Sequence, residues 1–568
     1  MFRKVSVPRF TYLVIAICIM ASLLLVACSN SSTTTPVTSK PAVTTTAATV
    51  APTTTKPATT ATTAPATSAA ATSLTPKTGG ILKIGTQTDA VVLGNPPTQT
   101  TVQDTITSKT CVEALGRYDA NGIMTPWLAD SWKTNADAKT ITITLKKGIT
   151  FHDGTPFNAA AVKFNIDRFV AAGRSELPAG TTTTVIDDST IQMQLTSWDN
   201  TAIIGMGYFA GPQISPTAWQ KGGTTDAERN AWAVANPVGT GPFMFVSWTK
   251  TVKQVYKKNP NYWIKGQPYL DGIEWQFFAD DTVMTAAYMN KEIDMIYLLT
   301  PIQAKNLTSQ GANVVVLNTG LGLQMTSVWY NSILPDSPFT NLAVRQAVCY
   351  SIDYKTLVST VYNNYATGVY EWAVPTSQYF NPDFKGYPYN PDQAKSLLAT
   401  AGYASGLKTT MLVNNDPTNV AVATAIQAMM AKGGFTVTLD VADNARYRSM
   451  TSPGGSFTAM CLASQRAEGD PALFFPRNLS LNGVIMNKTI MHPAAIEDTL
   501  TLAKQAPDQA TKVAYIKQLQ KIMFGDYAIF DPLFVPSGLG AKQAYVRGDG
   551  ILGIEYTQWT PETAWLNK

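Results

Sequence analysis

The sequence predicts a fold of the α/β or α+β class over residues 79–568, because strand patterns and helix patterns alternate along this whole region. Residues 140–145 alternate between threonine and apolar side chains, which is typical of a strand with one buried face. Asn158 can then cap a helix whose apolar side chains recur at helical spacing, namely Val162, Ile166 and Phe169. No internal repeat of fixed period is present, so a repeat architecture is not expected.

Glycines mark the first strand and two turns. A strand is expected at residues 81–85, directly after Gly79 and Gly80. Tight turns are expected at residues 147–148 and 152–154, because Gly148 and Gly154 can adopt the positive φ that such turns need.

Three further helices are expected later in the chain. One begins at Thr340 or Asn341 and has apolar residues at four-residue spacing, namely Val344, Val348 and Ile352. Asn390 caps the second helix, with Pro391 at its first position and Gly402 at its end. The third begins near Asp508 and has an apolar side made of Val513, Ile516, Leu519 and Met523.

The first 78 residues are predicted to be an export signal and a spacer. Residues 1–28 join three cations to an apolar run that ends in Leu-Val-Ala-Cys, which is typical of a bacterial secretory signal. That run is about 16 residues, short for a membrane span of roughly 20. Its end resembles the lipobox of bacterial lipoproteins, so Cys28 is the expected lipidation site. Residues 29–78 contain 19 Thr among 50 residues, a composition expected to form a disordered tether.

The net positive charge of the chain comes from its first 78 residues. Residues 1–78 hold six of the 43 Lys and Arg and none of the 38 Asp and Glu, which leaves 37 cations against 38 acids and a net charge of −1 in residues 79–568. A nearly neutral body offers no electrostatic attraction to a phosphate polymer, so nucleic-acid binding is disfavoured.

Three cysteines fall within residues 79–568, namely Cys111, Cys349 and Cys461. They are far apart and odd in number, so their pairing cannot be predicted from the sequence. Cys349 lies in a helical apolar pattern and is expected to be a small buried hydrophobic residue.

Four groups of motifs follow one another along residues 79–568. The first includes Glu-Ala-Leu-Gly-Arg-Tyr-Asp at 113–119 and Phe-His-Asp-Gly-Thr-Pro-Phe at 151–157, and the second includes Asn-Pro-Val-Gly-Thr-Gly-Pro-Phe at 236–243. The third is Val-Arg-Gln-Ala-Val at 344–348 with Ser-Ile-Asp at 351–353, and the fourth is at 389–398 with 401–403. In this order they resemble the extracellular solute-binding proteins, family 5, of ABC importers, which include oligopeptide-, dipeptide- and nickel-binding proteins.

This resemblance implies a two-lobed, type II periplasmic-binding-protein fold with an extra subdomain in the first lobe. The first lobe would be discontinuous, and the parts are then lobe I at 79–118, 237–325 and 530–568, the extra subdomain at 119–236, and lobe II at 330–528. Hinge strands are expected near 326–332 and 526–536, because lobes of this architecture close around a solute by hinge motion.

The motifs that could suggest catalysis have simpler explanations. His152 and His492 are too far apart in sequence to form a metal cluster of the usual spacing. Residues 239–242, Gly-Thr-Gly-Pro, lack the Lys-Ser/Thr pair of a phosphate-binding loop, so their glycines are expected to permit a tight backbone bend. No nucleophile elbow, zinc motif or pair of glycosidase carboxylates is found. We therefore predict no catalytic residue, metal or cofactor, and no enzymatic activity.

Residues 457–471 are the most informative segment about the solute. In the peptide-binding relatives that the resemblance points to, a Trp and then an Asp precede the Pro at the end of this segment, and the Asp pairs with the free amine of the peptide. Here Ser464 and Ala467 occupy those two positions, and a buried ammonium without a counter-charge costs several kcal/mol. Either Glu468 replaces the Asp, or Arg466 favours an acidic or polyhydroxylated solute, or both belong to a solvated loop.

Other residues are predicted to line the solute pocket because of their place in the pattern. Aromatic faces suit both peptide side chains and sugar rings. These residues are Asn95 after the first strand, Trp329, Tyr330 and Asn331 at the hinge, Trp372 after Tyr370, and Arg446 beside Tyr447.

The predicted function is that of a monomeric substrate-binding lipoprotein at the extracytoplasmic face of the cell membrane. It would capture a peptide-like solute and deliver it to an ABC permease and its ATPase. The alternatives are a non-peptide solute such as an oligosaccharide or a metal chelate, a surface-anchored hydrolase, and a sensor or adhesin built on the same fold.

Overall fold

The computed structural model describes residues 74–568, apart from 120–122, 175, 318–323, 452–454, 467–469, 474, 476–479, 482–487, 552–558 and 560. Within these ranges the chain forms one compact unit. None of the helices described in them is both long enough and apolar enough to cross a bilayer.

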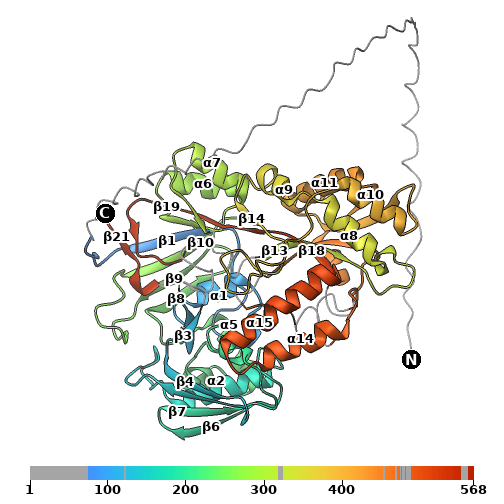
Figure 1. Cartoon of the computed structure of the whole chain (residues 1–568). Helices are drawn as coiled ribbons and strands as arrows, with labels where there is room; N and C mark the ends of the chain where they lie inside the picture. The colour runs from blue at the N-terminus through green and yellow to red at the C-terminus, as the bar shows by residue number, and fades with distance from the viewer. Residues whose placement is uncertain are drawn as a thin grey trace, which may run out of the picture. The chain divides into compact units, whose positions relative to one another are not determined.

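A seven-stranded sheet has the order β12-β19-β11-β1-β10-β9-β8 (Figure 1). Its central strand β1 pairs in parallel with both β10 and β11, and the other neighbours are antiparallel. The strands are β1 (Ile81–Thr86), β8 (Phe243–Thr249), β9 (Lys253–Lys258), β10 (Gly272–Phe277), β11 (Met295–Tyr297), β12 (Val314–Leu317) and β19 (Gly538–Lys542).

A six-stranded sheet has the order β14-β18-β13-β17-β15-β16. Here β15 pairs in parallel with β16 and β17, whereas β13 pairs antiparallel with both β17 and β18. The strands are β13 (Gln324–Tyr330), β14 (Ala366–Gly368), β15 (Leu407–Asn414), β16 (Phe435–Ala442), β17 (Met460–Arg466) and β18 (Phe530–Pro536).

A third, antiparallel sheet has the order β4-β5-β7-β6, and helix α2 lies next to its strands β6 and β7 (Figure 1). Two two-stranded ribbons complete the strands that the structure describes. The strands of the four-stranded sheet and of the two ribbons are β2 (Gly116–Tyr118), β3 (Met124–Pro126), β4 (Ala129–Asn135), β5 (Thr140–Leu145), β6 (Thr182–Asp187), β7 (Thr190–Gln194), β20 (Val546–Arg547) and β21 (Trp565–Leu566).

Helices cover the sheets and fill the connections between their strands. Two of them, α14 and α15, lie side by side (Figure 1). The α-helices are α1 (Val102–Ser108), α2 (Ala159–Ala171), α3 (Thr201–Gly205), α4 (Pro216–Lys221), α5 (Asp226–Ala235), α6 (Asp281–Met289), α7 (Pro301–Ser309), α8 (Leu342–Ser351), α9 (Tyr354–Thr360), α10 (Pro391–Thr400), α11 (Pro417–Lys432), α12 (Asn444–Thr451), α14 (Ala494–Gln505) and α15 (Gln509–Gln520). Short 3-10 turns lie at Pro96–Thr98, Pro338–Thr340 and Pro561–Thr563, and a π-helical turn at Lys521–Asp526 continues α15.

The predicted helix starts are confirmed by their capping hydrogen bonds. The side chains of Asn158, Asn341, Asn390 and Asp508 each accept a backbone N–H in the first turn of α2, α8, α10 and α15. Each cap satisfies one of the N–H groups that a helix start leaves without an intrahelical partner. The apolar sides of these helices are buried, as the spacing predicts.

The glycine predictions are also confirmed. Gly148, Gly154 and Gly402 all have positive φ. At Gly239 an added Cβ would lie 2.2 Å from the carbonyl oxygen of Cys111, so the two backbones approach too closely for any other residue. Cys111, Cys349 and Cys461 are buried and form no disulfide.

Two connections join the seven-stranded sheet to the six-stranded sheet. The chain passes from β12 to β13, and it returns from β18 to β19 through the single residue Ser537. Because β13 and β18 are paired, the start of β13 lies next to the end of β18.

Asp531 is a buried carboxyl group within β18, beside Cys349. Burial raises the pKa of Asp531 to about 7, and a hydrogen bond with Cys349 opposes the rise. The ordinary pKa of an Asp is about 3.9. The folded chain therefore binds more protons here than the unfolded chain between about pH 4 and 7, so this group lowers the stability as the pH rises through that window.

We expect Asp531→Asn to remove this pH dependence. From pH 4.5 to 6.5 the wild type should lose stability relative to the variant by about 1.4 kcal/mol per pH unit at most. Urea unfolding of both proteins at pH 4.5, 5.5 and 6.5 measures the difference. A difference that stays constant across the three pH values contradicts the raised pKa.

Candidate functional site

A cavity of about 360 Å³ lies between the seven-stranded and six-stranded sheets, next to the start of β13 and to Ser537. It is lined by Leu299, Pro301, Gln324, Tyr362, Asp416, Thr418, Asn419, Ser464, Pro536, Ser537 and Leu539. Below it is called the inter-sheet pocket.

The inter-sheet pocket lies at the carboxyl ends of parallel strands in both sheets. Leu299 and Pro301 follow β11, which pairs in parallel with β1. Residues 416–419 follow β15, and Ser464 lies near the end of β17, the parallel neighbour of β15. Ligands of open α/β sheets bind in the crevice outside these strand ends. This position makes the inter-sheet pocket the candidate solute site.

Asp416 is the one carboxylate or cation among the described residues that line this pocket. It is exposed, and its Oδ1 accepts the backbone N–H groups of Thr418 at 2.9 Å and Asn419 at 3.1 Å, which caps helix α11. Oδ2 takes no part in these two bonds, so it remains available to a solute. The rest of the lining is neutral, and burial raises the pKa of Tyr362 to about 12, so that side chain stays uncharged.

Of the residues predicted from sequence to bind solute, Ser464 lies in the inter-sheet pocket. Its hydroxyl is 3.2 Å from that of Thr326 on the neighbouring strand β13. Arg466 is the last residue of β17, and its side chain is outside the described part of the chain. Ala467 and Glu468 lie outside the described residues altogether. The roles proposed for Arg466 and Glu468 therefore remain predictions.

The predicted aromatic residues at the hinge lie in the core. Trp329 is fully buried, is stacked on Phe530 with ring centroids 4.2 Å apart, and donates its Nε1–H to Ser327 at 2.7 Å. Trp372 is buried against the edge of the same Phe530 ring. Tyr330 is stacked on Phe339. Such packing stabilises the six-stranded sheet beside the pocket, and neither described cavity of this size is lined by these rings.

The predicted polar residues already have protein partners. Asn331 is fully buried and donates to the carbonyl of Phe457 at 2.6 Å. Asn95 is buried and accepts from Arg168 at 2.7 Å. Arg446 is exposed and forms two hydrogen bonds of 2.7 Å with Asp440. Their contact with a solute remains a prediction.

Sequence reasoning did not single out Asp416. Its signal was present, because Asn-Asn-Asp-Pro at 414–417 stands between a strand pattern and a helix pattern. An acid before a proline at a helix start is usually explained by capping alone. The sequence pattern therefore gives no separate indication of binding at this residue.

Comparison with known proteins now identifies the class. The model of the bacterial extracellular solute-binding proteins, family 5, matches residues 124–484, which is more than half of the chain. The chain therefore belongs to this family. Its predicted α/β, two-lobed fold is confirmed, since solved structures of such binding proteins superpose over most of both chains.

Three of these structures show the breadth of the fold. The CtaP substrate-binding protein of Listeria monocytogenes has a TM-score of 0.77 at 20% identity and covers 87% of this chain and 100% of its own. DppA of Helicobacter pylori, in complex with the peptide STSA, has a TM-score of 0.71 at 24% identity over 87% and 99%. NikA of Brucella suis, in complex with Fe(III)-EDTA, has a TM-score of 0.72 at 22% identity over 84% and 99%. At these identities the likeness establishes the fold alone.

Two relatives have closer sequences. The glutathione-binding protein GsiB of Pectobacterium atrosepticum is 30% identical over 350 residues, 59% of this chain and 64% of that protein. GsiB of Shigella flexneri is 28% identical over 439 residues, 75% of this chain and 83% of that protein. Both names describe binding proteins.

Proposed function

We propose that this protein captures a peptide-like solute in the inter-sheet pocket and delivers it to an ABC permease and its ATPase. One observation carries the proposal: the pocket lies between two sheets, at the carboxyl ends of parallel strands in both of them. The glutathione-binding relatives support a peptide-like solute, because glutathione is itself a modified tripeptide.

Hinge closure accounts for capture and release. The seven-stranded sheet belongs to lobe I, strands β14 to β17 to lobe II, and the four-stranded sheet to the extra subdomain at 119–236, while β13 and β18 are the hinge strands between the lobes. Rotation at the hinge strands β13 and β18 opens or closes the pocket, since only a few residues of a hinge need to change φ and ψ. Binding, not catalysis, is the activity.

The export signal and tether place this activity outside the cell membrane. Lipidation of Cys28 anchors a monomeric protein to the extracytoplasmic face, and residues 29–78 hold the folded part away from the surface. Labelled-palmitate incorporation into the wild type, lost in Cys28→Ser, tests the anchor.

Asp416 supplies the counter-charge for the free amine of the solute. Asp416 lines the same pocket as Ser464, and no cation in the described lining competes for its carboxylate. In this proposal the loop after β15 provides the negative charge that the sequence lacks at position 467.

We expect Asp416→Asn to weaken the binding of free-amine peptides by roughly 10- to 100-fold, which is the effect of losing one charged hydrogen bond. Asn is as good a helix cap as Asp, so the fold should be unchanged. Calorimetric titration with trialanine and with N-acetyl-trialanine measures the effect, and the acetylated peptide should bind both proteins equally. Glu468→Gln is the matched control, and a selective loss in that variant alone would transfer the role to Glu468.

Thermal unfolding in the presence of solute pools tests the function as a whole. The pools are free-amine tripeptides, glutathione, oligosaccharides and nickel chelates. A ligand at 100 times its Kd stabilises the folded state by about 2.7 kcal/mol. Stabilisation by tripeptides or glutathione supports the proposal, and stabilisation by sugars or chelates alone would replace the peptide with a different solute class.

A further inference from the structure

A second cavity of about 360 Å³ lies away from the inter-sheet pocket and shares no lining residue with it. One wall comes from the β2–β4 and α3 segments, and the other from residues 378–379, Asp470 and the start of α15. The lining residues are Tyr118, Ile123, Met124, Trp132, Thr134, Trp198, Asn200, Ile203, Ile204, Gln378, Tyr379, Asp470, Ala506, Pro507, Asp508, Gln509 and Lys512. This space is called the side cavity below.

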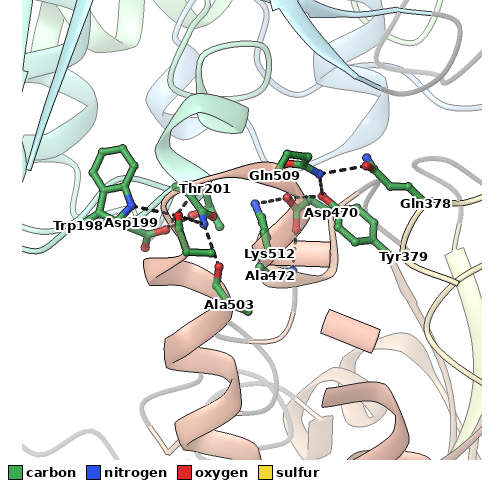
Figure 2. Close-up of polar contacts among 12 residues, drawn as sticks. Trp198, Asp199, Thr201, Gln378, Tyr379, Asp470, Ala472, Ala503, Gln509 and Lys512 are labelled. Atoms are coloured by element: carbon green, nitrogen blue, oxygen red, sulfur yellow. Dashed lines mark hydrogen bonds and ion pairs between the residues drawn. The ribbon is translucent and has the colours of Figure 1, made fainter. Parts of the chain in front are cut away.

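Direct contacts hold the two walls together (Figure 2). The Asn200 side chain donates to the carbonyl of Ala503 at 2.8 Å, and the backbone N–H of Asn200 donates to the carbonyl of Lys504 at 2.9 Å. Trp198 donates its Nε1–H to Ala506 at 3.3 Å, and Lys504 pairs with Asp199 at 2.7 Å. These donors satisfy carbonyls that the end of helix α14 leaves without intrahelical partners, so the side cavity has a defined edge.

Every ionised side chain in the lining is already paired or bonded. Asp470 and Lys512 form a buried ion pair, and Asp470 also accepts from Tyr379 at 2.9 Å (Figure 2). Both carboxylate oxygens of Asp508 accept hydrogen bonds from Thr511, at 2.8 Å from its backbone N–H and 3.0 Å from its hydroxyl. The side cavity therefore offers no uncompensated charge to a ligand, and a charged ligand would lose its hydration without gaining a partner.

The neutral groups of the lining are of two kinds. Trp132, Trp198 and Met124 give one wall an apolar, largely aromatic surface. Gln378 and Gln509 place amides at the exposed rim, where Gln509 donates to Gln378 at 3.1 Å. The Oδ1 of Asn200 also lacks a hydrogen-bond partner among the described residues, but it is fully buried and does not face the cavity. A pocket of this volume, mainly apolar with a few polar groups, has the build of a small-molecule site.

We propose that the side cavity binds an uncharged molecule with a flat apolar body and a hydrogen-bonding edge, such as an aromatic amide. The body lies against the Trp132 and Trp198 wall, and the edge bonds to the amides of Gln378 and Gln509 at the rim. This site is separate from the inter-sheet pocket, and it does not depend on the solute assigned there. A molecule that touches both walls strengthens the contact between α3 and α14.

Three probes of one shape and different charge test the proposal, namely neutral indole-3-acetamide, anionic indole-3-acetate and cationic tryptamine. Titration monitored by ligand-observed NMR should give saturable binding of the acetamide to the full chain, with both charged analogues weaker by roughly tenfold or more. Thr134→Trp fills the side cavity from an exposed position on edge strand β4 and should abolish this binding. Thr134→Ser should retain it.

The outcomes are decisive in both directions. Absence of saturable acetamide binding overturns the proposal, as does equal binding of all three probes or binding that persists in Thr134→Trp. Trialanine titration of Thr134→Trp distinguishes this failure from failure of the proposed function, because trialanine binding at the inter-sheet pocket should be the same in the variant and the wild type.

Discussion

Replacing Lys512 with methionine is expected to lower the free energy of unfolding by about 3–5 kcal/mol, the cost of leaving one member of a buried ion pair alone. Both side chains of the Asp470–Lys512 pair are only 3% exposed. Asp470 also accepts the hydroxyl of Tyr379 and the backbone N–H of Ala472. Methionine keeps the length of the lysine stem but removes the cation, so the Asp470 carboxylate would remain buried without a counter-charge.

Urea unfolding of the wild type and the variant measures this loss. Lys395→Met is the matched control, because Lys395 pairs with Asp392 on helix α10 at the surface, where such pairs contribute about 1 kcal/mol or less. The double variant Asp470→Asn with Lys512→Met should recover part of the loss, since no charge is then left unpaired. A Lys512→Met loss as small as that of Lys395→Met would show that the buried pair contributes nothing.

The second large effect is expected at Glu113, a buried carboxylate that accepts four side-chain hydrogen bonds. Oε1 accepts from Trp127 at 2.9 Å and Tyr262 at 2.7 Å. Oε2 accepts from Thr240 at 2.8 Å and Trp263 at 3.1 Å. Burial raises the pKa of Glu113, and these donated bonds oppose the rise. The residue ties the segment before β2 to Trp127, which follows β3, and to Thr240 and residues 262–263 on either side of β8 and β9.

Glu113→Gln should therefore be destabilising although it keeps the shape of the side chain. In the variant an NH₂ group would replace one carboxylate oxygen, so two buried donors would lose their acceptor. Each buried donor left without a partner costs about 1–3 kcal/mol, so the free energy of unfolding should fall by about 2–6 kcal/mol. Urea unfolding and the near-UV circular dichroism of the tryptophans measure it. Stability equal to that of the wild type would mean that Glu113 is protonated and already acts as a donor.

Local structure was predictable because its causes are local. The alternation at 140–145 became β5 with the predicted bounds, and Asn158 and Asn390 cap the helices they were expected to cap. Sheet order was not available from these patterns, since strand partners such as β1 and β11 are more than 200 residues apart. The π-helical turn at Lys521–Asp526 was also missed, because it has no distinct spacing of apolar residues.

The site was harder to predict than the fold. Trp329 and Trp372 are predicted from the sequence to contact the ligand. In the structure both pack on Phe530 in the core, where large aromatic side chains bury the most surface. Asp416 was missed because its position before Pro417 is explained by capping. Its role in the inter-sheet pocket depends on β11 and β15 ending at the same place, which is a property of the assembled sheets and not of either segment.

A crystal structure of the protein with bound trialanine would locate the solute site. We expect peptide density in the inter-sheet pocket, between the carboxyl ends of β11 and β15, with the peptide amine within hydrogen-bond distance of the Asp416 carboxylate. Peptide density in the side cavity, or on the outer surface with the inter-sheet pocket empty, would contradict the assignment of the solute site.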